Sequence, residues 1–227
     1  MRPSALNFWA GVRAELPLLI GVFPFGLIYG ALAIGAGMPT AAAQLMSSIV
    51  FAGSSQFAAA QLIHDSAPAL VIVITIGIIN LRHMLYSASV APYLRGLPGR
   101  WKVLLAYLLT DEAYAPTIIH YQKDGTASEG HWFFLGAGLG LWTTWQIGTA
   151  LGILLGTALP ASWPLDFALP LTFIAMIVPA LKDRPMAAAA ASSGLVALLA
   201  FALPYKLGFI LAAFAGIFVG MILERHA

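Results

Sequence analysis

The stretch ALVIVITIGIINLRHMLYSAS, residues 69–89, joins an apolar run to a group of polar and charged side chains. The run is typical of a helix that crosses a membrane, yet Asn80, Arg82 and His83 follow where the pattern asks for more Leu and Ile. A charge at membrane depth costs about 3 kcal/mol or more on insertion scales unless it faces a partner. The stretch therefore predicts a membrane helix with a polar centre.

The composition of the whole chain agrees with this interpretation. Its 227 residues are 60% hydrophobic and only 9% charged, with a mean hydropathy of +0.88, whereas soluble domains carry about 25% charged residues. Apolar runs of about 20 residues recur along the chain, long enough to cross a hydrocarbon core of about 30 Å. We expect an all-α polytopic membrane protein with a single transporter domain over residues 1–227.

Proline and glycine divide the chain into eight apolar segments. They lie at about 17–36, 41–62, 68–92, 101–121, 132–158, 165–181, 186–203 and 206–223. Eight full crossings would put the N-terminal arginines and the Arg95 loop on opposite faces, against the positive-inside rule. If segments 41–62 and 165–181 are re-entrant, six crossings remain and the basic loops become cytoplasmic. The sequence thus predicts six to eight transmembrane segments, with these two re-entrant.

Segment 41–62 supports the re-entrant interpretation because it carries many hydroxyl and amide side chains around Gly53. Irregular backbone at membrane depth survives only where it is buried in protein or lines a cavity. The two halves of the chain also share a glycine spacing, with Gly26 and Gly30 matching Gly148 and Gly152. This similarity predicts an inverted repeat with halves at about 15–121 and 131–223, although helices rich in small residues give the same pattern.

Arg82 has an expected partner in the next segment. Arg82 lies 11 residues before Tyr93 and Asp111 lies 11 residues after Arg100, so both lie about 16 Å from the loop that joins their helices. We expect them to form a buried ion pair, which either holds two helices together or serves transport. His83 and Glu112 are their neighbours, and proton coupling through His83, Asp111 or Glu112 is a further hypothesis.

A substrate site is expected where segment one breaks. In GVFPFGLIYG, residues 21–30, a proline removes a backbone donor and disrupts the preceding turn, which predicts a broken or merely kinked helix. The GSSQF stretch, residues 53–57, adds uncharged polar groups that suit a zwitterion. The expected substrate-binding residues are Pro24, Phe25, Gly26, Gly53, Ser54, Ser55, Gln56 and Asn80. The polar set Thr143, Thr144, Trp145 and Gln146 is expected to serve packing.

Enzymatic motifs are absent from the sequence. It contains no Walker A loop, no metal-ligand spacing and no nucleophile elbow, and it has no cysteine. We therefore expect neither catalysis nor a metal or cofactor.

Four motifs, in order, resemble the AzlC family of branched-chain amino acid permeases. They are GVFPFGLIYGALA (21–33), VFAGSSQFA (50–58), NLRHMLYSASVAPYL (80–94) and LLTDEAYA (108–115). The resemblance implies export of leucine, isoleucine and valine across the bacterial cytoplasmic (inner) membrane by a multi-pass protein. It also implies a small membrane partner of the AzlD type.

Three functions remain open at this point. The first is a secondary transporter that exports branched-chain amino acids. The second is a channel-like pore for a small solute, because re-entrant segments occur in channels as well. The third is an assembly subunit of a two-component exporter.

Overall fold

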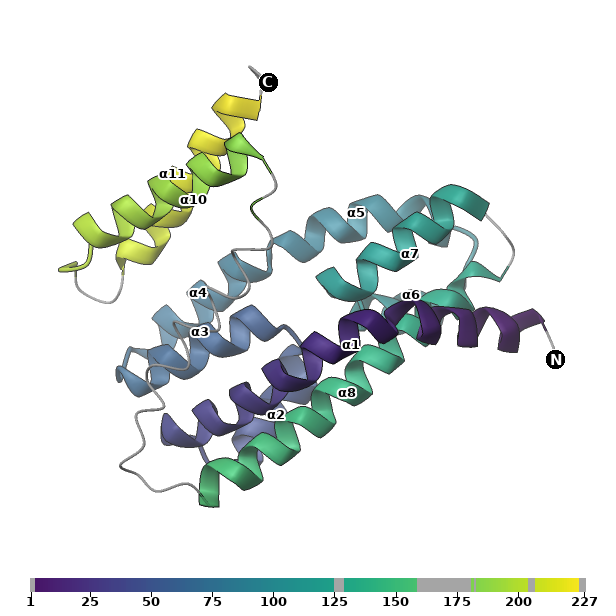
Figure 1. Ribbon diagram of the computed structural model, residues 1–227, viewed down its shortest axis with the longest axis horizontal. Coiled ribbons are helices and arrows are strands. Elements are labelled where there is room, and N and C mark those ends of the chain that lie inside the picture. Colours follow the sequence, from purple (N-terminus) through teal and green to yellow (C-terminus); the bar gives the residue numbers. More distant parts are fainter. Residues whose placement is uncertain (1–2, 125–128, 159–180, 182, 204–206, 225–227) are drawn as a thin grey trace. The chain divides into compact units, whose positions relative to one another are not determined.

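The computed structural model describes residues 3–124, 129–158, 181, 183–203 and 207–224, and these are helical without any strand. The helices are α1 (Pro3–Gly35), α2 (Thr40–Val50), α3 (Gly53–His64), α4 (Ala69–Asn80), α5 (Arg82–Leu94), α6 (Gly99–Tyr107), α7 (Asp111–Asp124), α8 (Gly130–Ala158), α10 (Arg184–Leu199) and α11 (Leu207–Glu224) (Figure 1). They form two compact units. The first holds α1 to α8 apart from the start of α4, and the second holds α10 and α11. The expected single domain stays a prediction.

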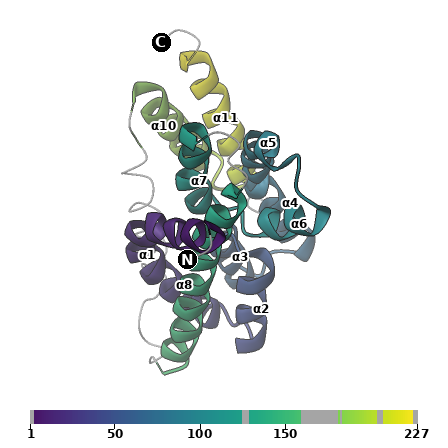
Figure 2. The same ribbon diagram turned by 90° about the vertical axis from the view of Figure 1, so that its right-hand side faces the viewer.

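The first unit is built on the long parallel pair α1 and α8, which lie side by side in both ribbon views (Figure 1 and Figure 2). Glycines allow their backbones to approach. A Cβ atom on Gly30 would overlap the backbone of α8, and one on Gly152 would overlap the backbone of α1. Small residues serve the same purpose in membrane helix pairs generally. The shared glycine spacing is thus a packing contact between parallel helices. An inverted repeat would make them antiparallel, so this spacing does not support one.

Helices α2 and α3 form a broken hairpin. They are separated by Phe51 and Ala52, and Phe51 adopts φ 41°, in the left-handed region that bulky residues rarely occupy. α2 begins after the end of α1, and α3 then runs parallel to α1, with the Phe57 ring 6.1 Å from that of Tyr29. Both ends of the hairpin therefore lie at the end of the unit where α1 finishes. This geometry agrees with a re-entrant segment 41–62, whose relation to a membrane stays a prediction.

Segment 101–121 differs from the expected single crossing, because α6 and α7 form a second hairpin that turns at Leu108–Thr110. The rings of Trp101 on α6 and Trp132 on α8 are 4.9 Å apart. The rings of Tyr121 on α7 and Tyr93 on α5 stack at 4.8 Å. Both hairpin ends therefore lie at the start of α8, and α7 runs parallel to α5. The single helix expected over this segment, antiparallel to segment 68–92, is therefore wrong, and the relation of the hairpin to a membrane stays a prediction.

A local capping interaction explains the turn. The backbone N–H of Ala113 donates to the Oγ1 atom of Thr110, at 3.3 Å, and Asp111 and Glu112 occupy the first turn of α7. A threonine cap followed by acidic residues stabilises a helix start, because both compensate the unpaired N–H groups there. A new helix therefore begins at this point.

Of the two alternatives expected at Pro24, the broken helix is wrong, because α1 is continuous through Pro17 and Pro24. Membrane helices tolerate proline where neighbouring groups satisfy the freed backbone carbonyls. The long contact with α8 supports α1 over most of its length.

The second unit contains the helix pair α10 and α11. Asp183 caps α10 by accepting a hydrogen bond from the Met186 N–H, at 2.8 Å. Gly216 on α11 lies close to α10, where a Cβ atom would be 3.1 Å from the Ala189 carbonyl oxygen and from the Ser193 Cβ. These helices agree with the segments expected at 186–203 and 206–223. The re-entrant segment expected at 165–181 lies almost wholly outside the described residues.

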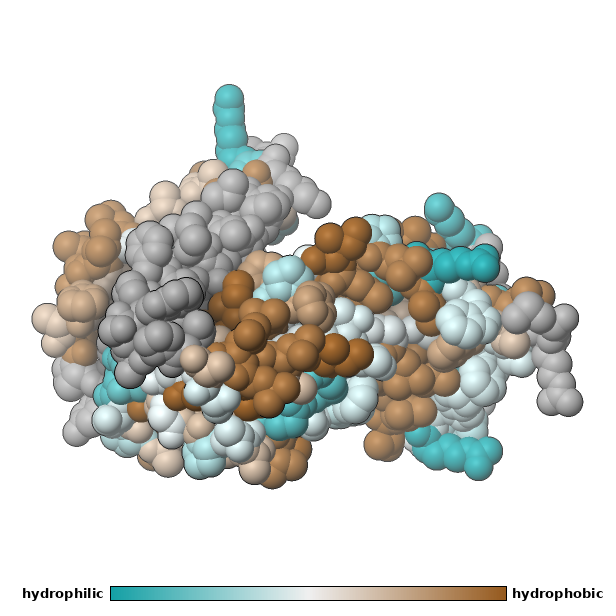
Figure 3. Space-filling view, turned by 60° about the horizontal axis from the view of Figure 1, so that its bottom comes forward, coloured by the Kyte–Doolittle hydropathy of each residue, from teal (hydrophilic) through white to brown (hydrophobic). Residues whose placement is uncertain are grey.

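Hydrophobic side chains cover much of the surface of the first unit, and hydrophilic ones project mainly near the end that carries the N-terminus (Figure 3). Ile20 is 78% exposed and Leu85 is 73% exposed. Soluble monomers rarely expose large apolar areas. Among the described residues, Ser4–Gly35 and Ala69–Leu94 are helices that are long and apolar enough to be candidate membrane spans.

Candidate functional site

The two broken hairpins meet at Arg82, the first residue of α5. Its Nη2 atom donates to the Ser54 Oγ on α3, at 2.7 Å, and its Nη1 atom donates to the Asp111 Oδ2 on α7, at 3.1 Å. The expected contact between Arg82 and Asp111 forms, but the two side chains are 27% and 36% exposed, so the ion pair is half-buried rather than buried. One guanidinium therefore joins the start of α3 to the start of α7, which the fork of donors on arginine permits.

A second connection runs from α3 to the end of α4. The Ser55 Oγ donates to the Asn80 Oδ1, at 2.5 Å. The His83 Nδ1 lies 3.2 Å from the Asn80 carbonyl oxygen. Leu81 separates α4 from α5 at this level. Ser54, Ser55, Asn80, Arg82 and Asp111 thus form one polar centre, with His83 and Glu112 beside it in the sequence.

The helix starts at this centre carry different charges. Ala52 precedes α3, provides no side-chain cap and is followed by a first turn without acidic residues. The first turn of α7 holds both Asp111 and Glu112. A helix N-terminus carries a partial positive charge and unpaired N–H groups. The start of α3 therefore favours an anion, whereas the start of α7 already holds carboxylates.

Donors without a standard hydrogen bond add to the positive character near α3. Gln56 is fully buried, and its Oε1 accepts from the Trp145 Nε1 at 3.1 Å. Among the described residues, the Gln56 Nε2 and the Arg82 Nε make no hydrogen bond of standard geometry, and the Gln56 amide donor lies near the Tyr29 hydroxyl, with which it interacts only weakly. Gly53 lies against the same indole, where a Cβ atom would be 3.1 Å from the ring. A buried donor without an acceptor is costly, so these groups suit a ligand that supplies acceptor oxygens.

The inner ends of α2 and α6 also meet. The Tyr107 hydroxyl on α6 donates to the Ser48 carbonyl oxygen on α2 and accepts from the Trp142 Nε1 on α8, the latter at 2.7 Å. The Phe51 and Tyr107 rings lie 6.0 Å apart. The tips of both hairpins are therefore in contact with each other and with α8.

Helix α8 contributes more to this region than the sequence indicated. The Gln44 Nε2 and the Ser48 Oγ both donate to the Gln146 Oε1, at 2.7 and 2.9 Å, and Ser47 and Thr149 share a hydrogen bond of 2.9 Å. The sequence signal for these contacts was the set of polar residues at helical spacing on α8. Gln146 was expected to serve packing, and its hydrogen bonds show that it and Thr149 fix the position of helix α2 against α8.

The expected contribution of α1 is the main difference from the prediction. Pro24 is exposed and Phe25 is half-buried, while Gly26 faces α8, where a Cβ atom would lie 3.1 Å from the Trp145 carbonyl oxygen. Glu15 on α1 was not predicted from the sequence as a site residue. This side chain is fully buried, and neither carboxylate oxygen has a hydrogen-bond partner among the described residues.

Metal binding finds no support in the described part of the chain, where no group of three or more His, Asp or Glu side chains is placed to hold an ion. Long apolar helices, exposed hydrophobic surface and a central polar cluster define an α-helical membrane protein.

Comparison with known proteins identifies the family. The sequence model of the AzlC protein family matches residues 17–159, a range that includes the whole polar centre, and the chain belongs to this family. An uncharacterized membrane protein of Archaeoglobus fulgidus is 33% identical and covers 92% of both chains.

Two further relatives carry more specific names. The inner membrane protein YgaZ of Escherichia coli is 25% identical over 80% of this chain and 76% of its own. The branched-chain amino acid transport protein AzlC of Bacillus subtilis is 28% identical over 76% of this chain and 68% of its own. No solved structure matches the chain significantly.

Proposed function

We propose that this protein is a secondary transporter that exports branched-chain amino acids, and that the substrate binds between the two hairpin tips. The observation that carries the proposal is the position of Arg82, bonded to Ser54 on one hairpin and Asp111 on the other. The name of the Bacillus subtilis relative supports the substrate class. The role is transport rather than catalysis.

The chemistry of the centre suits a zwitterion. The substrate carboxylate would bind at the uncapped start of α3, where the Gln56 Nε2 and the Arg82 Nε are free to donate. The ammonium group would bind near Asp111 and Glu112 at the start of α7. Discontinuous helices recognise amino acids in this way in other transporters, because their N-termini favour the carboxylate.

The fold supports a topology for this transport. In the proposal, α1, α4 with α5, and α8 cross the membrane, while the two hairpins enter from opposite faces. The end that carries Arg13, Arg95, Arg100, Lys102 and Lys123 is cytoplasmic, following the positive-inside rule. The membrane would be the bacterial cytoplasmic (inner) membrane. Movement of either hairpin tip would open the site to one side, as alternating access requires.

Two further parts of the proposal concern coupling and assembly. Proton coupling through His83, Asp111 or Glu112 predicts that H83Q, D111N or E112Q alters the pH dependence of transport, and unchanged profiles in all three would exclude it. A small AzlD-type membrane subunit is the proposed partner. Transport by the purified chain alone, unchanged when that subunit is added, would contradict a requirement for it.

Counterflow of labelled valine tests the function directly. Proteoliposomes that contain this chain and its partner should show saturable valine and leucine counterflow, which R82Q abolishes. Ion conductance without saturation would instead indicate a channel-like pore. Full transport by the partner alone would make this chain an assembly subunit.

A further inference from the structure

A cavity of about 300 Å³ lies between α5, α6 and α8, on the basic end of the first unit. Most of its wall is apolar and includes Val90, Leu94, Leu105 and Phe134. None of the residues of the polar centre lines it. Its volume falls at the small end of the range for small-molecule sites, about 300–1,000 Å³. The cavity is therefore large enough for part of a ligand and is chemically different from the polar centre.

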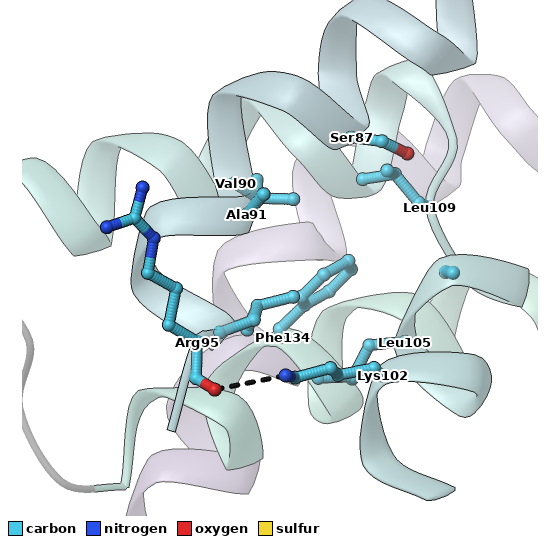
Figure 4. Close-up of a pocket in the computed structure, with 10 residues that line it drawn as sticks. Ser87, Val90, Ala91, Arg95, Lys102, Leu105, Leu109 and Phe134 are labelled. Carbon is cyan, nitrogen blue, oxygen red and sulfur yellow. Dashed lines mark hydrogen bonds between the residues drawn. The ribbon is translucent and has the colours of Figure 1, made fainter. Parts of the chain in front are cut away.

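Arg95 and Lys102 both line this cavity. Figure 4 shows the Lys102 ammonium beside the Arg95 carbonyl oxygen, the Arg95 guanidinium extending away from it, and Ser87 and Leu109 at the other end. The Lys102 Nζ donates to the Arg95 carbonyl oxygen, at 3.0 Å. An ammonium group has three donors, so this bond leaves two of them available. The described part of the structure gives neither cation an acidic partner. Both side chains are exposed and accessible.

This arrangement selects against an amino acid. The two cations would repel an ammonium group, and no acidic side chain lines the cavity to bind one. The arrangement instead matches an anion attached to an apolar chain, since a cationic mouth leads into an apolar interior. Basic pockets between transmembrane helices on the cytoplasmic side bind anionic lipid head groups.

We propose that the α5–α6–α8 cavity binds an anionic phospholipid, with its phosphate at Arg95 and Lys102 and part of an acyl chain along Val90, Leu105 and Phe134. The lipid would fill the space between α5 and the inward arm of the second hairpin, α6. Since α6 carries Tyr107 at the hairpin tip, an occupied cavity would support the tip from the cytoplasmic side. The placement of the cytoplasmic end rests on the proposed topology, but binding itself does not.

Thermal unfolding of delipidated protein in mixed micelles tests the site. Phosphatidylglycerol should raise the unfolding temperature in a saturable way, and phosphatidylcholine with the same acyl chains should not. The double variant R95Q/K102Q should weaken the apparent affinity for phosphatidylglycerol about 30-fold, since each cation contributes about a fivefold factor. A106F, which narrows the cavity without changing charge, should also weaken binding. R100Q is the matched control, because Arg100 lies on α6 two residues before Lys102 but does not line the cavity.

Several results would overturn the proposal. Equal stabilisation by the two lipids would remove the role of the phosphate charge, and equal stabilisation by inorganic phosphate would indicate a free-anion site. Equal loss in R100Q and in the double variant would indicate general surface attraction. Displacement of the lipid by valine would place the cavity on the transport path. If the wild-type protein binds the lipid as expected but shows no valine counterflow, only the proposed transport function is contradicted.

Discussion

The two broken hairpins have the same shape but opposite chemistry at their tips. The α2–α3 hairpin presents a helix start without a cap or an acidic residue, next to a buried amide donor on Gln56. The α6–α7 hairpin presents a start capped by Thr110 and filled by Asp111 and Glu112. Arg82 binds both. In the proposed function, this difference gives the carboxylate and the ammonium group of the substrate separate places at the two tips.

The strongest test of the comparison is whether both hairpins return to the face they entered from. The chain has no cysteine, so single cysteines can be labelled in intact cells with a membrane-impermeant maleimide. T40C, at the outer end of α2, should react fully from outside. R100C and Q122C, at the two ends of the second hairpin, should both stay unlabelled until the membrane is opened. External labelling of Q122C but not R100C would restore a single crossing.

Arg82 gives the next largest expected effect. R82Q should reduce transport by about 100-fold or more, because it breaks both links and leaves Asp111 unpaired. R82K keeps the charge but cannot bond both hairpins in the same geometry, so it should also lose most activity. Counterflow assays and unfolding temperatures should be measured together. In R82Q/D111N stability should recover while transport stays lost, and recovery of transport would make the pair purely structural.

Gln56 tests the expected difference between the two hairpin tips, because it supplies the amide donor at the start of α3. Q56E preserves an oxygen that can accept from Trp145 but replaces the free donor with a second acceptor and adds negative charge. The affinity for valine should fall about tenfold, as expected when a ligand loses a buried hydrogen bond to a charged group. Q122E, at an exposed position on α7, is the matched control and should bind normally. Unchanged binding in Q56E would remove the carboxylate from the start of α3.

Tyr107 should give the smallest effect. Y107F removes the hydroxyl that contacts Ser48 and Trp142 at the hairpin tips. Of these two bonds, only the one to the Ser48 carbonyl oxygen joins the two hairpin tips. One such bond contributes about 1 kcal/mol, so the transport rate should change about fivefold while valine affinity stays the same. Pre-steady-state transport and equilibrium binding can be compared in the same preparation. A large loss of affinity would place Tyr107 in the substrate site instead.

The contact between Arg82 and Asp111 could be predicted from the sequence because both were counted from one loop. The count succeeded although segment 101–121 is a hairpin rather than a single helix, since α6 leads toward the middle of the unit before the chain turns. The turn itself had a readable signal in Thr110, Asp111 and Glu112, a threonine cap followed by acidic residues. Reading the segment as one apolar run missed it.

Features that depend on contacts between helices could not be predicted from the local sequence pattern. Pro24 suggested a break, but the contact with α8 supports a continuous α1. The roles of Trp145 and Gln146 depend on which residues α2 and α3 bring to α8, and hydrophobic periodicity does not encode that register. The burial of Glu15 likewise depends on helix packing.

The most direct measurement is equilibrium binding of three related ligands to the purified protein. Valine has both charged groups, isobutylamine lacks the carboxylate and isovalerate lacks the ammonium. Wild-type protein should bind valine at least about tenfold more tightly than either analogue, since each loses one charged contact. Q56E should weaken isovalerate, and D111N should weaken isobutylamine. Equal binding of valine and both analogues, insensitive to these substitutions, would contradict a zwitterion site between the hairpin tips.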